Sequence, residues 1–194
     1  GIEREYEQPH SLVYVGMTWR EIEPEKGVYD WDGLEEKYQF DFWSQRGKKF
    51  NLRIVLDNPT DDPTHMDIPD WLYDELDAEG DPGTWYETDE IGHGFSPNYS
   101  HPLLIEYHEK LIEEFAARYD NDPRIAYIQL GSLGHWGEWH NWPEEKTGAF
   151  PKLDVSDQYV RHYLDNFSNK LLGMRKPFPI ASENNLGLFN DMFG

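Results

Sequence analysis

The stretch IAYIQLGSLGHWGEWHNW, residues 125–142, contains both a candidate strand and a candidate site. Its first six residues, 125–130, are mainly β-branched, aromatic or aliphatic, which is typical of a strand buried on both faces. Gly131, Gly134 and Gly137 follow and allow sharp backbone turns. The polar and aromatic residues of this loop are His135, Trp136, Glu138, Trp139, His140 and Trp142. Barrels of parallel strands and helices carry reactive groups on the loops after their strands, so this loop is a candidate site.

Apolar runs of strand length recur elsewhere in the chain. They predict strands over residues 12–17, 50–56 and 178–182, in addition to 125–130. Apolar residues at three-to-four-residue spacing predict helices over residues 32–47 with Asp32 as N-cap, over 102–118, and from Ser156 to Gly173. This alternation of strands and helices predicts a parallel sheet flanked by helices.

The length of the chain bears on the kind of sheet. A closed eight-stranded barrel needs about 250 residues, whereas the chain has 194. We therefore predict an α/β fold, a partial TIM (β/α)8 barrel of about four parallel strands with flanking helices, as one incomplete domain over residues 1–194. A smaller open α/β sheet is the alternative. Residues 57–101 are predicted to form a long ordered loop with a short helix over 69–73, and residues 1–10 an irregular lead-in.

Composition excludes several classes of partner. The chain has 38 acidic and 17 basic residues, a formal charge of -21, which disfavours nucleic acid. It contains no cysteine and no apolar run long enough to span a membrane. We expect no cofactor. The sequence contains no phosphate-binding glycine loop, and no nucleophile elbow either. A mature secreted or periplasmic protein would have lost its signal peptide, and we expect such a location. The oligomeric state is not indicated.

Two parts of the sequence resemble known families. Residues 19–31, WREIEPEKGVYDW, resemble a strand-end signature of (β/α)8 glycoside hydrolases of the cellulase and β-galactosidase type. The segments 119–125, 130–131, 136–140 and 185–191 more narrowly resemble the bacterial barrel families known as DUF4832 and its relatives. The resemblance covers roughly residues 12–194. It implies that the four predicted strands are the second to fifth of a barrel, without the first and the last three.

The resemblance also implies a catalytic glutamate. In the glycosidase clan the general acid/base ends the fourth strand, which corresponds to Glu138, although Gly137 replaces the usual asparagine before it. Hydrolysis needs two carboxyl groups, and surrounding tryptophans would suit a protonated one. Glu183, after the predicted strand 178–182, is the candidate second carboxylate, with Asp57 behind it. The alternative for Glu138 is a hydrogen bond to loop amides.

Several other residues at or near strand ends are candidate saccharide contacts: Trp19, Arg20, Arg53, Asp57, His135, Trp136, Trp139, His140 and Asn184. Indole rings offer flat apolar platforms for sugar rings, and the alternative is that they fill the core of the loops. That second interpretation is favoured for Trp71 and Trp85, whereas the choice is open for Trp136 and Trp139. For the arginines the alternative is an ion pair that holds the loops, which is favoured for Arg53.

Three functions are consistent with these residues. The first is an O-glycosidase acting on an oligo- or polysaccharide with Glu138 as general acid/base. The second is a non-catalytic carbohydrate-binding barrel. The third is a metal-dependent hydrolase using His135 and His140, but their spacing matches no known metal motif, so no metal site is predicted.

Overall fold

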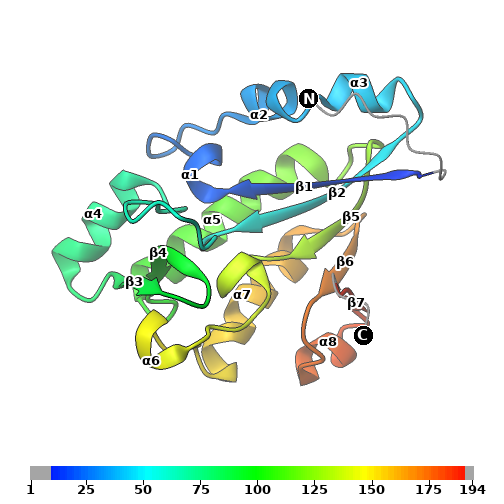
Figure 1. Cartoon of the computed structure of the whole chain (residues 1–194). Coiled ribbons are helices and arrows are strands. Elements are labelled where there is room, and N and C mark those ends of the chain that lie inside the picture. The colour runs from blue at the N-terminus through cyan, green and yellow to red at the C-terminus, as the bar shows by residue number, and fades with distance from the viewer. Residues whose placement is uncertain (1–9, 191–194) are drawn as a thin grey trace.

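Five parallel strands form the centre of the computed structural model, which describes residues 10–190 (Figure 1). Their order across the sheet is β1-β2-β5-β6-β7. The bounds are Leu12–Thr18 for β1, Lys49–Val55 for β2, Ile125–Leu130 for β5, Leu171–Met174 for β6 and Gly187–Leu188 for β7. Each strand pairs in parallel with its neighbour in this order. The α/β class and the partial barrel are thereby confirmed, with five strands instead of about four. The predicted lead-in lies, apart from residue 10, outside the described residues.

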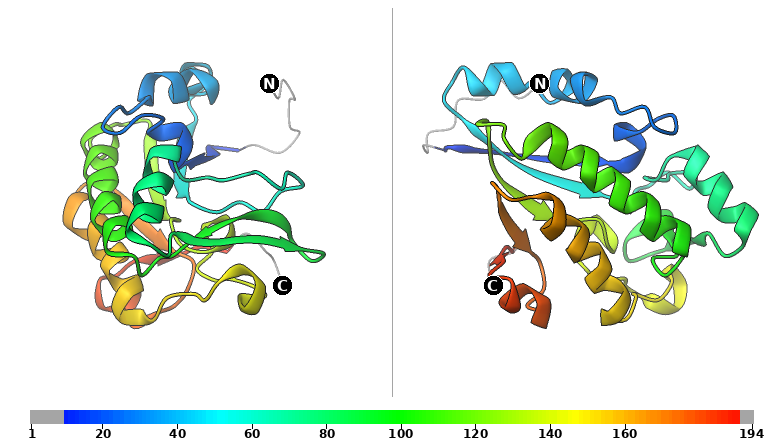
Figure 2. Two further views of the ribbon diagram at one scale, coloured as in Figure 1. Left: turned by 90° about the vertical axis from the view of Figure 1, so that its left-hand side faces the viewer. Right: turned by 180° about the vertical axis from the view of Figure 1, so that it is seen from behind.

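Two long helices, α5 (Pro102–Tyr119) and α7 (Leu153–Asn166), cover one face of the sheet (Figure 2). The core lies between them and the strands, because alternate residues of β2 and β5 point toward the helices. Core side chains from both layers include Leu52, Ile54, Ile128, Leu130, Leu111, Phe115 and Tyr159, all of them fully buried. The three-to-four-residue spacing that predicted residues 102–118 as a helix is confirmed.

The shorter helices lie in the connections. The predicted helix 32–47 is two helices, α2 (Trp31–Lys37) and α3 (Phe40–Ser44), because Gln39 between them has a left-handed backbone with φ of 59°. Asp30, two residues before the predicted cap Asp32, is the N-cap and accepts a hydrogen bond from the Gly33 amide. The remaining short helices are α1 (Trp19–Ile22), η1 (His135–Gly137), α6 (Glu144–Thr147) and α8 (Pro179–Glu183).

Residues 57–101 are more regular than predicted, and the short helix expected over 69–73 is the beginning of a longer one. They contain α4 (Asp70–Glu79) and an antiparallel hairpin of β3 (Gly83–Thr88) and β4 (Gly92–Pro97). The left view of Figure 2 shows the hairpin extending from the sheet on the side opposite α5 and α7. The hairpin was not predicted, because glycine and proline residues usually indicate a loop, whereas here they lie at the ends of short strands.

The fourth predicted strand is misplaced. Residues 179–182 belong to α8, with Phe178 as its N-cap, and its first residue is Pro179, a position that suits proline because the first helical amides need no partner. The fourth strand along the main sheet is β6, which was predicted to be the end of the helix from Ser156 to Gly173. The helix α7 instead begins at Leu153, with Lys152 as N-cap, and ends at Asn166. No helix within residues 10–190 is both long and apolar enough to cross a bilayer.

A buried polar chain links the two long helices to the end of β5. His108 of α5 and His162 of α7 place their Nδ1 atoms 2.8 Å apart, so one ring donates to the other. His108 Nε2 lies 2.8 Å from Ser132 Oγ, which lies 2.7 Å from the Tyr163 hydroxyl. Burial holds the pKa of His108 well below its usual value and lowers that of His162 as well. Both imidazoles are therefore neutral in the folded protein near neutral pH.

The two buried neutral histidines lead us to expect a loss of stability in mild acid. Below the ordinary histidine pKa of about 6.5, His108 and His162 bind protons in the unfolded state but stay neutral in the folded state. The free energy of unfolding therefore falls as pH falls. We expect a slope of up to about 1.4 kcal/mol per pH unit for each buried histidine, measured by urea unfolding. His108→Gln should flatten the slope and His93→Gln should not. Equal slopes for these two variants and the wild type would exclude this cause.

Candidate functional site

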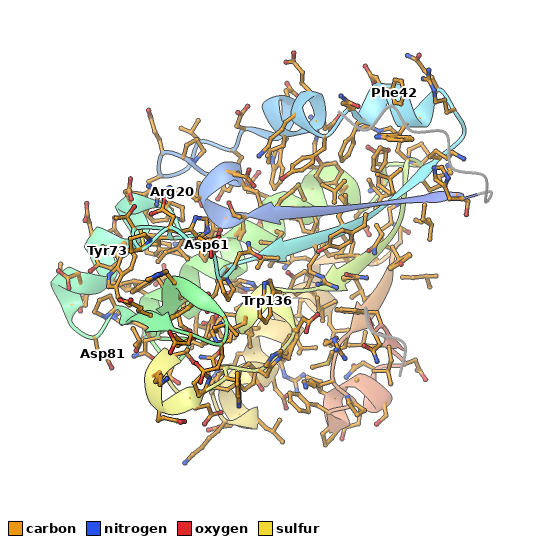
Figure 3. The ribbon with its side chains drawn as sticks, viewed as in Figure 1. Arg20, Phe42, Asp61, Tyr73, Asp81 and Trp136 are labelled. Carbon is orange, nitrogen blue, oxygen red and sulfur yellow. The ribbon has the colours of Figure 1, made fainter. Side chains whose placement is uncertain are left out.

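The carboxyl ends of β1, β2, β5 and β6 meet at one edge of the sheet because these strands are parallel. The loop after β5, residues 131–142, is called the η1 loop here, and it lies at this edge. Figure 3 shows Trp136 in front of the ends of β2 and β5, on the side away from α5 and α7. The segment predicted from sequence as the candidate site therefore does lie at the edge where such barrels carry reactive groups.

The η1 loop has an unusual backbone. Ser132, Trp136 and Trp139 have φ of 56°, 55° and 60°, the left-handed region that side chains with a Cβ disfavour. Backbone hydrogen bonds hold this shape: Ser132 N donates to Ile54 O (2.7 Å) and Trp136 N donates to Asp57 O (2.7 Å). At Gly131 a Cβ would stand 2.1 Å from Ile54 O, so the loop leaves β5 in close contact with the end of β2.

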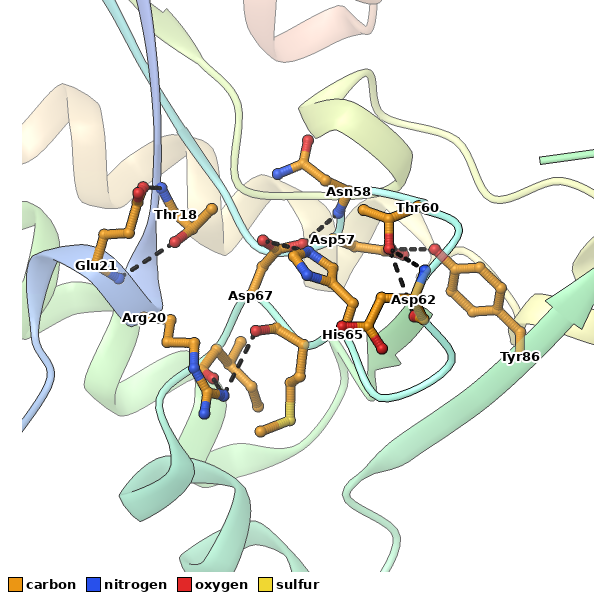
Figure 4. Close-up of polar contacts among 12 residues, drawn as sticks. Thr18, Arg20, Glu21, Asp57, Asn58, Thr60, Asp62, His65, Asp67 and Tyr86 are labelled. Carbon is orange, nitrogen blue, oxygen red and sulfur yellow. Dashed lines mark hydrogen bonds and ion pairs between the residues drawn. The ribbon is translucent and has the colours of Figure 1, made fainter. Parts of the chain in front are cut away.

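Asp57 and His135 form a buried pair behind this loop. His135 Nδ1 donates to Asp57 Oδ2 (2.9 Å), and the Tyr86 hydroxyl donates to Asp57 Oδ1 (2.5 Å; Figure 4). Both residues of the pair are buried, so neither offers a surface to a sugar as predicted; they anchor the η1 loop to β2 and the hairpin. Burial and the neighbouring carboxylate strongly raise the pKa of Tyr86, which keeps its hydroxyl a donor. Among described residues, His135 Nε2 has no hydrogen-bond partner.

Tyr86 is a residue that sequence reasoning missed. Its position in β3 places its ring 5.3 Å from the His135 ring, centroid to centroid. The β-branched and aromatic residues Thr84, Trp85 and Tyr86 would have indicated a strand, had the glycines around them not suggested a loop.

Arg20 binds the loop between β2 and α4. Its guanidinium donates to both carboxylate oxygens of Asp70 (2.7 Å each) and to the carbonyl oxygens of Met66 and Ile68 (3.5 and 3.3 Å; Figure 4 shows the two carbonyl contacts). In the same loop Asp67 accepts from the Asn58 amide and from His65 Nε2, and burial raises the Asp67 pKa. The ion-pair alternative for Arg20 therefore fits its surroundings better than a saccharide contact.

Arg53 lies on the sheet face opposite the long helices. Its Nε donates to Gln129 Oε1 (2.7 Å), and Nη1 donates to Trp136 O (3.2 Å). Its guanidinium carbon lies 5.1 and 4.6 Å from the ring centroids of Tyr14 and Phe189. The side chain is buried, so it connects strands and the η1 loop beneath the candidate site.

Glu138 is partly accessible, and it is the carboxylate of the η1 loop. Its Oε2 lies 3.8 Å from Arg175 Nη2, and each of these side chains is 18% exposed. Arg175 is the first residue after β6, so two adjacent strand ends deliver this pair. Sequence reasoning missed Arg175 because β6 was assigned to a helix. His140 Nδ1 donates to the Glu138 carbonyl oxygen (3.2 Å), and this contact stabilises the backbone of the η1 loop at Glu138.

The tryptophans divide into exposed and buried ones. Trp136 and Trp142 are 37% and 54% exposed and offer indole surface to solvent, although Trp142 was not among the predicted contacts. Trp139 is only 2% exposed, and its Nε1 donates to Leu130 O (2.7 Å), so it belongs to the core of the loop. Trp19 is fully buried and donates to Glu23 Oε2 (2.8 Å), and burial raises the pKa of Glu23. Neither Trp19 nor Trp139 presents a platform.

Glu183 and Asn184 lie elsewhere than predicted. They stand at the end of α8 and not at the end of a strand, because residues 179–183 are helical. Asn184 Nδ2 donates to Ile180 O (2.9 Å) within the same turn, and both side chains are exposed. The strand-end argument for Glu183 as second carboxylate is therefore wrong.

The residues of the η1 loop do not make a metal site. Among the described residues, no group of three or more histidine, aspartate and glutamate side chains is arranged to hold a metal ion. The Nδ1 atoms of His135 and His140 are both engaged, with Asp57 and with the Glu138 carbonyl. The geometry therefore favours neither a metal centre nor the hydrolase that would use one.

Comparisons with known proteins relate this architecture to carbohydrate enzymes. A family model described as Beta-galactosidase (Glyco_hydro_42) matches residues 7–165. Beta-galactosidase BgaH of Haloferax lucentense is 28% identical over 125 residues, which is 60% of this chain and 16% of that protein. Endo-glycoceramidase II from Rhodococcus superposes with a TM-score of 0.54 at 19% identity, over 84% of this chain and 40% of that one.

A second structure gives the same picture. A GH5_18 protein from Streptomyces cattleya superposes with a TM-score of 0.53 at 12% identity, over 86% of this chain and 35% of that one. At such identities the structures show the fold alone. The chain spans well under half the length of each of these proteins.

Proposed function

Because the chain belongs to the Glyco_hydro_42 family, whose model is described as Beta-galactosidase, we propose that its site acts on the O-glycosidic bonds of an oligo- or polysaccharide, with Glu138 as general acid/base. The observation that carries this proposal is the position of Glu138. It is a partly exposed carboxylate at the carboxyl edge of the parallel sheet, in the family-matched part of the chain. Because segments 119–125 and 136–140 resemble DUF4832-type proteins, we also propose that this chain is related to them.

The surroundings of Glu138 support a sugar ligand. Trp136, two residues earlier, offers exposed indole surface on which a pyranose ring could stack. The Arg175 guanidinium stands near the carboxylate and supplies several N–H donors for sugar hydroxyls. His140 holds the backbone at Glu138, so the carboxylate is presented from a fixed loop.

The second carboxyl group of the reaction is not assigned to a described residue. Glycosidases need a nucleophile or base on the other side of the scissile bond. Asp57 is buried and bonded to His135 and Tyr86, and Glu183 ends a helix. The proposal for this chain is therefore the acid/base side of the site. A non-catalytic saccharide-binding barrel is the second candidate, favoured by the exposed indole of Trp136, which can bind a sugar without a second carboxylate.

The test is the hydrolysis of lactose, a β-galactoside whose sugar leaving group needs protonation by the general acid, by Glu138→Gln. Removal of a general acid should lower kcat/KM at least about a hundredfold, or about 2.7 kcal/mol in activation free energy. Glu144→Gln, an exposed glutamate of α6, is the matched control and should leave the rate unchanged.

Two other outcomes have clear meanings. Equal rates for Glu138→Gln and wild type would remove Glu138 from the mechanism. If the wild type binds galactose without hydrolysing the galactoside, the non-catalytic candidate replaces the enzyme.

A further inference from the structure

A pocket of about 440 Å³ lies between the β3–β4 hairpin and the segment that leads from α6 into α7. Its walls include Thr84 and Ser96 of the hairpin, Ser100, Asn141, Phe150 and Lys152. Glu138, Arg175 and Trp136 are not among its lining residues, so it is separate from the candidate active site. Its volume falls within the range of small-molecule sites.

Asn141 is the central polar residue of this pocket. Its Nδ2 donates to Ser96 Oγ (3.0 Å) and to Gly148 O (2.8 Å), so it ties the two walls together. The residue is 5% exposed, and among described residues its Oδ1 has no hydrogen-bond partner. Asn141 therefore fixes the distance between the two walls, and its side-chain amide reports on changes in the pocket.

The other walls indicate what kind of ligand fits. The Phe150 ring packs against Tyr99 and Trp139, with centroids 6.4 and 6.3 Å away, and gives the pocket an apolar side. Thr84, Ser96 and Ser100 provide hydroxyl groups. A compact molecule with one apolar face and several hydroxyls matches both kinds of wall, and a sugar ring has that character.

The charges around the pocket disfavour an anion. Its lining contains Asp81 and Asp154 against Lys152, in a chain whose formal charge is -21. A phosphate or carboxylate ligand would meet net repulsion at this place. The ligand class that remains is neutral and rich in hydroxyls.

We propose that this pocket is a second saccharide site, which holds a neutral sugar unit through the hydroxyl groups of Thr84 and Ser100 and the Phe150 face. The choice of a sugar among hydroxyl-rich molecules rests on the proposed function. A second site would hold a long chain beside the site of Glu138 or hold a separate copy of the sugar. Neither role requires Glu138 to be catalytic.

The experiment is a titration with D-galactose followed by NMR of the side-chain amide of Asn141. We expect its signals to shift in the wild type and in Glu138→Gln alike. Ser100→Trp places a large ring at the exposed rim of the pocket and should weaken the response at least tenfold. Ser168→Trp, an exposed serine outside the pocket, is the matched control and should respond like wild type. Thr84→Val, which removes one wall hydroxyl at constant size, should also weaken it and serves if Ser100→Trp fails to fold.

The proposal is overturned if D-galactose leaves the Asn141 signals unmoved, if inorganic phosphate moves them and galactose does not, or if Ser100→Trp and Ser168→Trp respond equally. Glu138 is not part of this readout. A failed hydrolysis test therefore leaves the pocket result readable, and a silent pocket leaves the hydrolysis result readable.

Discussion

Replacing Asp57 with alanine should lower the free energy of unfolding by about 2–6 kcal/mol, because it leaves two buried donors unsatisfied at about 1–3 kcal/mol each. The Asp57 carboxylate accepts from both His135 and Tyr86, and both donors would be left without it inside the protein. Urea unfolding monitored by circular dichroism would measure the loss.

Two variants give this experiment its controls. Asp61→Ala removes an exposed carboxylate of the same loop and should change stability by no more than about 0.5 kcal/mol. Asp57→Asn keeps an oxygen for the Tyr86 hydroxyl and should lie between the two. If Asp57→Ala is no less stable than Asp61→Ala, the buried pair does not anchor the η1 loop.

Replacing Trp139 with alanine should also lower the free energy of unfolding by about 3–5 kcal/mol, because it empties a large volume in a packed region. The indole is buried against Phe150 and Phe178 and donates to Leu130 O. Trp142→Ala is the matched change on an exposed indole of the same loop and should cost about 0.5 kcal/mol or less.

The same pair of variants distinguishes core from platform. Trp142→Ala should leave the fold intact, so any loss of galactoside binding would come from the missing surface. A Trp139→Ala protein as stable as Trp142→Ala would contradict the assignment of Trp139 to the core.

Local sequence patterns were sufficient to predict the central strands and α5. Residues 125–130 are β-branched and aromatic with a glycine directly after them, and residues 102–118 keep one apolar face, so neither had a strong competitor. The end of the sheet was different. The run Tyr159, Tyr163, Phe167, Leu171 continues helical spacing past the true end of α7 at Asn166, and this concealed β6.

For the candidate site, the sequence was sufficient to identify residues of the η1 loop, but it did not indicate which residues they contact. Asp57 and His135 are 78 positions apart, and only the register of β2 beside β5 brings them together. Trp136 and Trp139 look alike in sequence and both have a left-handed backbone, yet Trp136 is exposed, whereas Trp139 is buried against Phe150 and Phe178. No periodic pattern reports such a backbone.

The left-handed residues of the η1 loop have a consequence for ligand choice. A loop held in an uncommon shape by its own amides at Ser132, His135 and Trp136 is ordered before any sugar arrives. Binding then requires little further loss of conformational freedom, which favours affinity for a small ligand. The same preorganisation prevents the loop from reshaping around ligands of other outlines. Selectivity at this site should therefore come from shape, with poor tolerance of bulky substituents on the sugar.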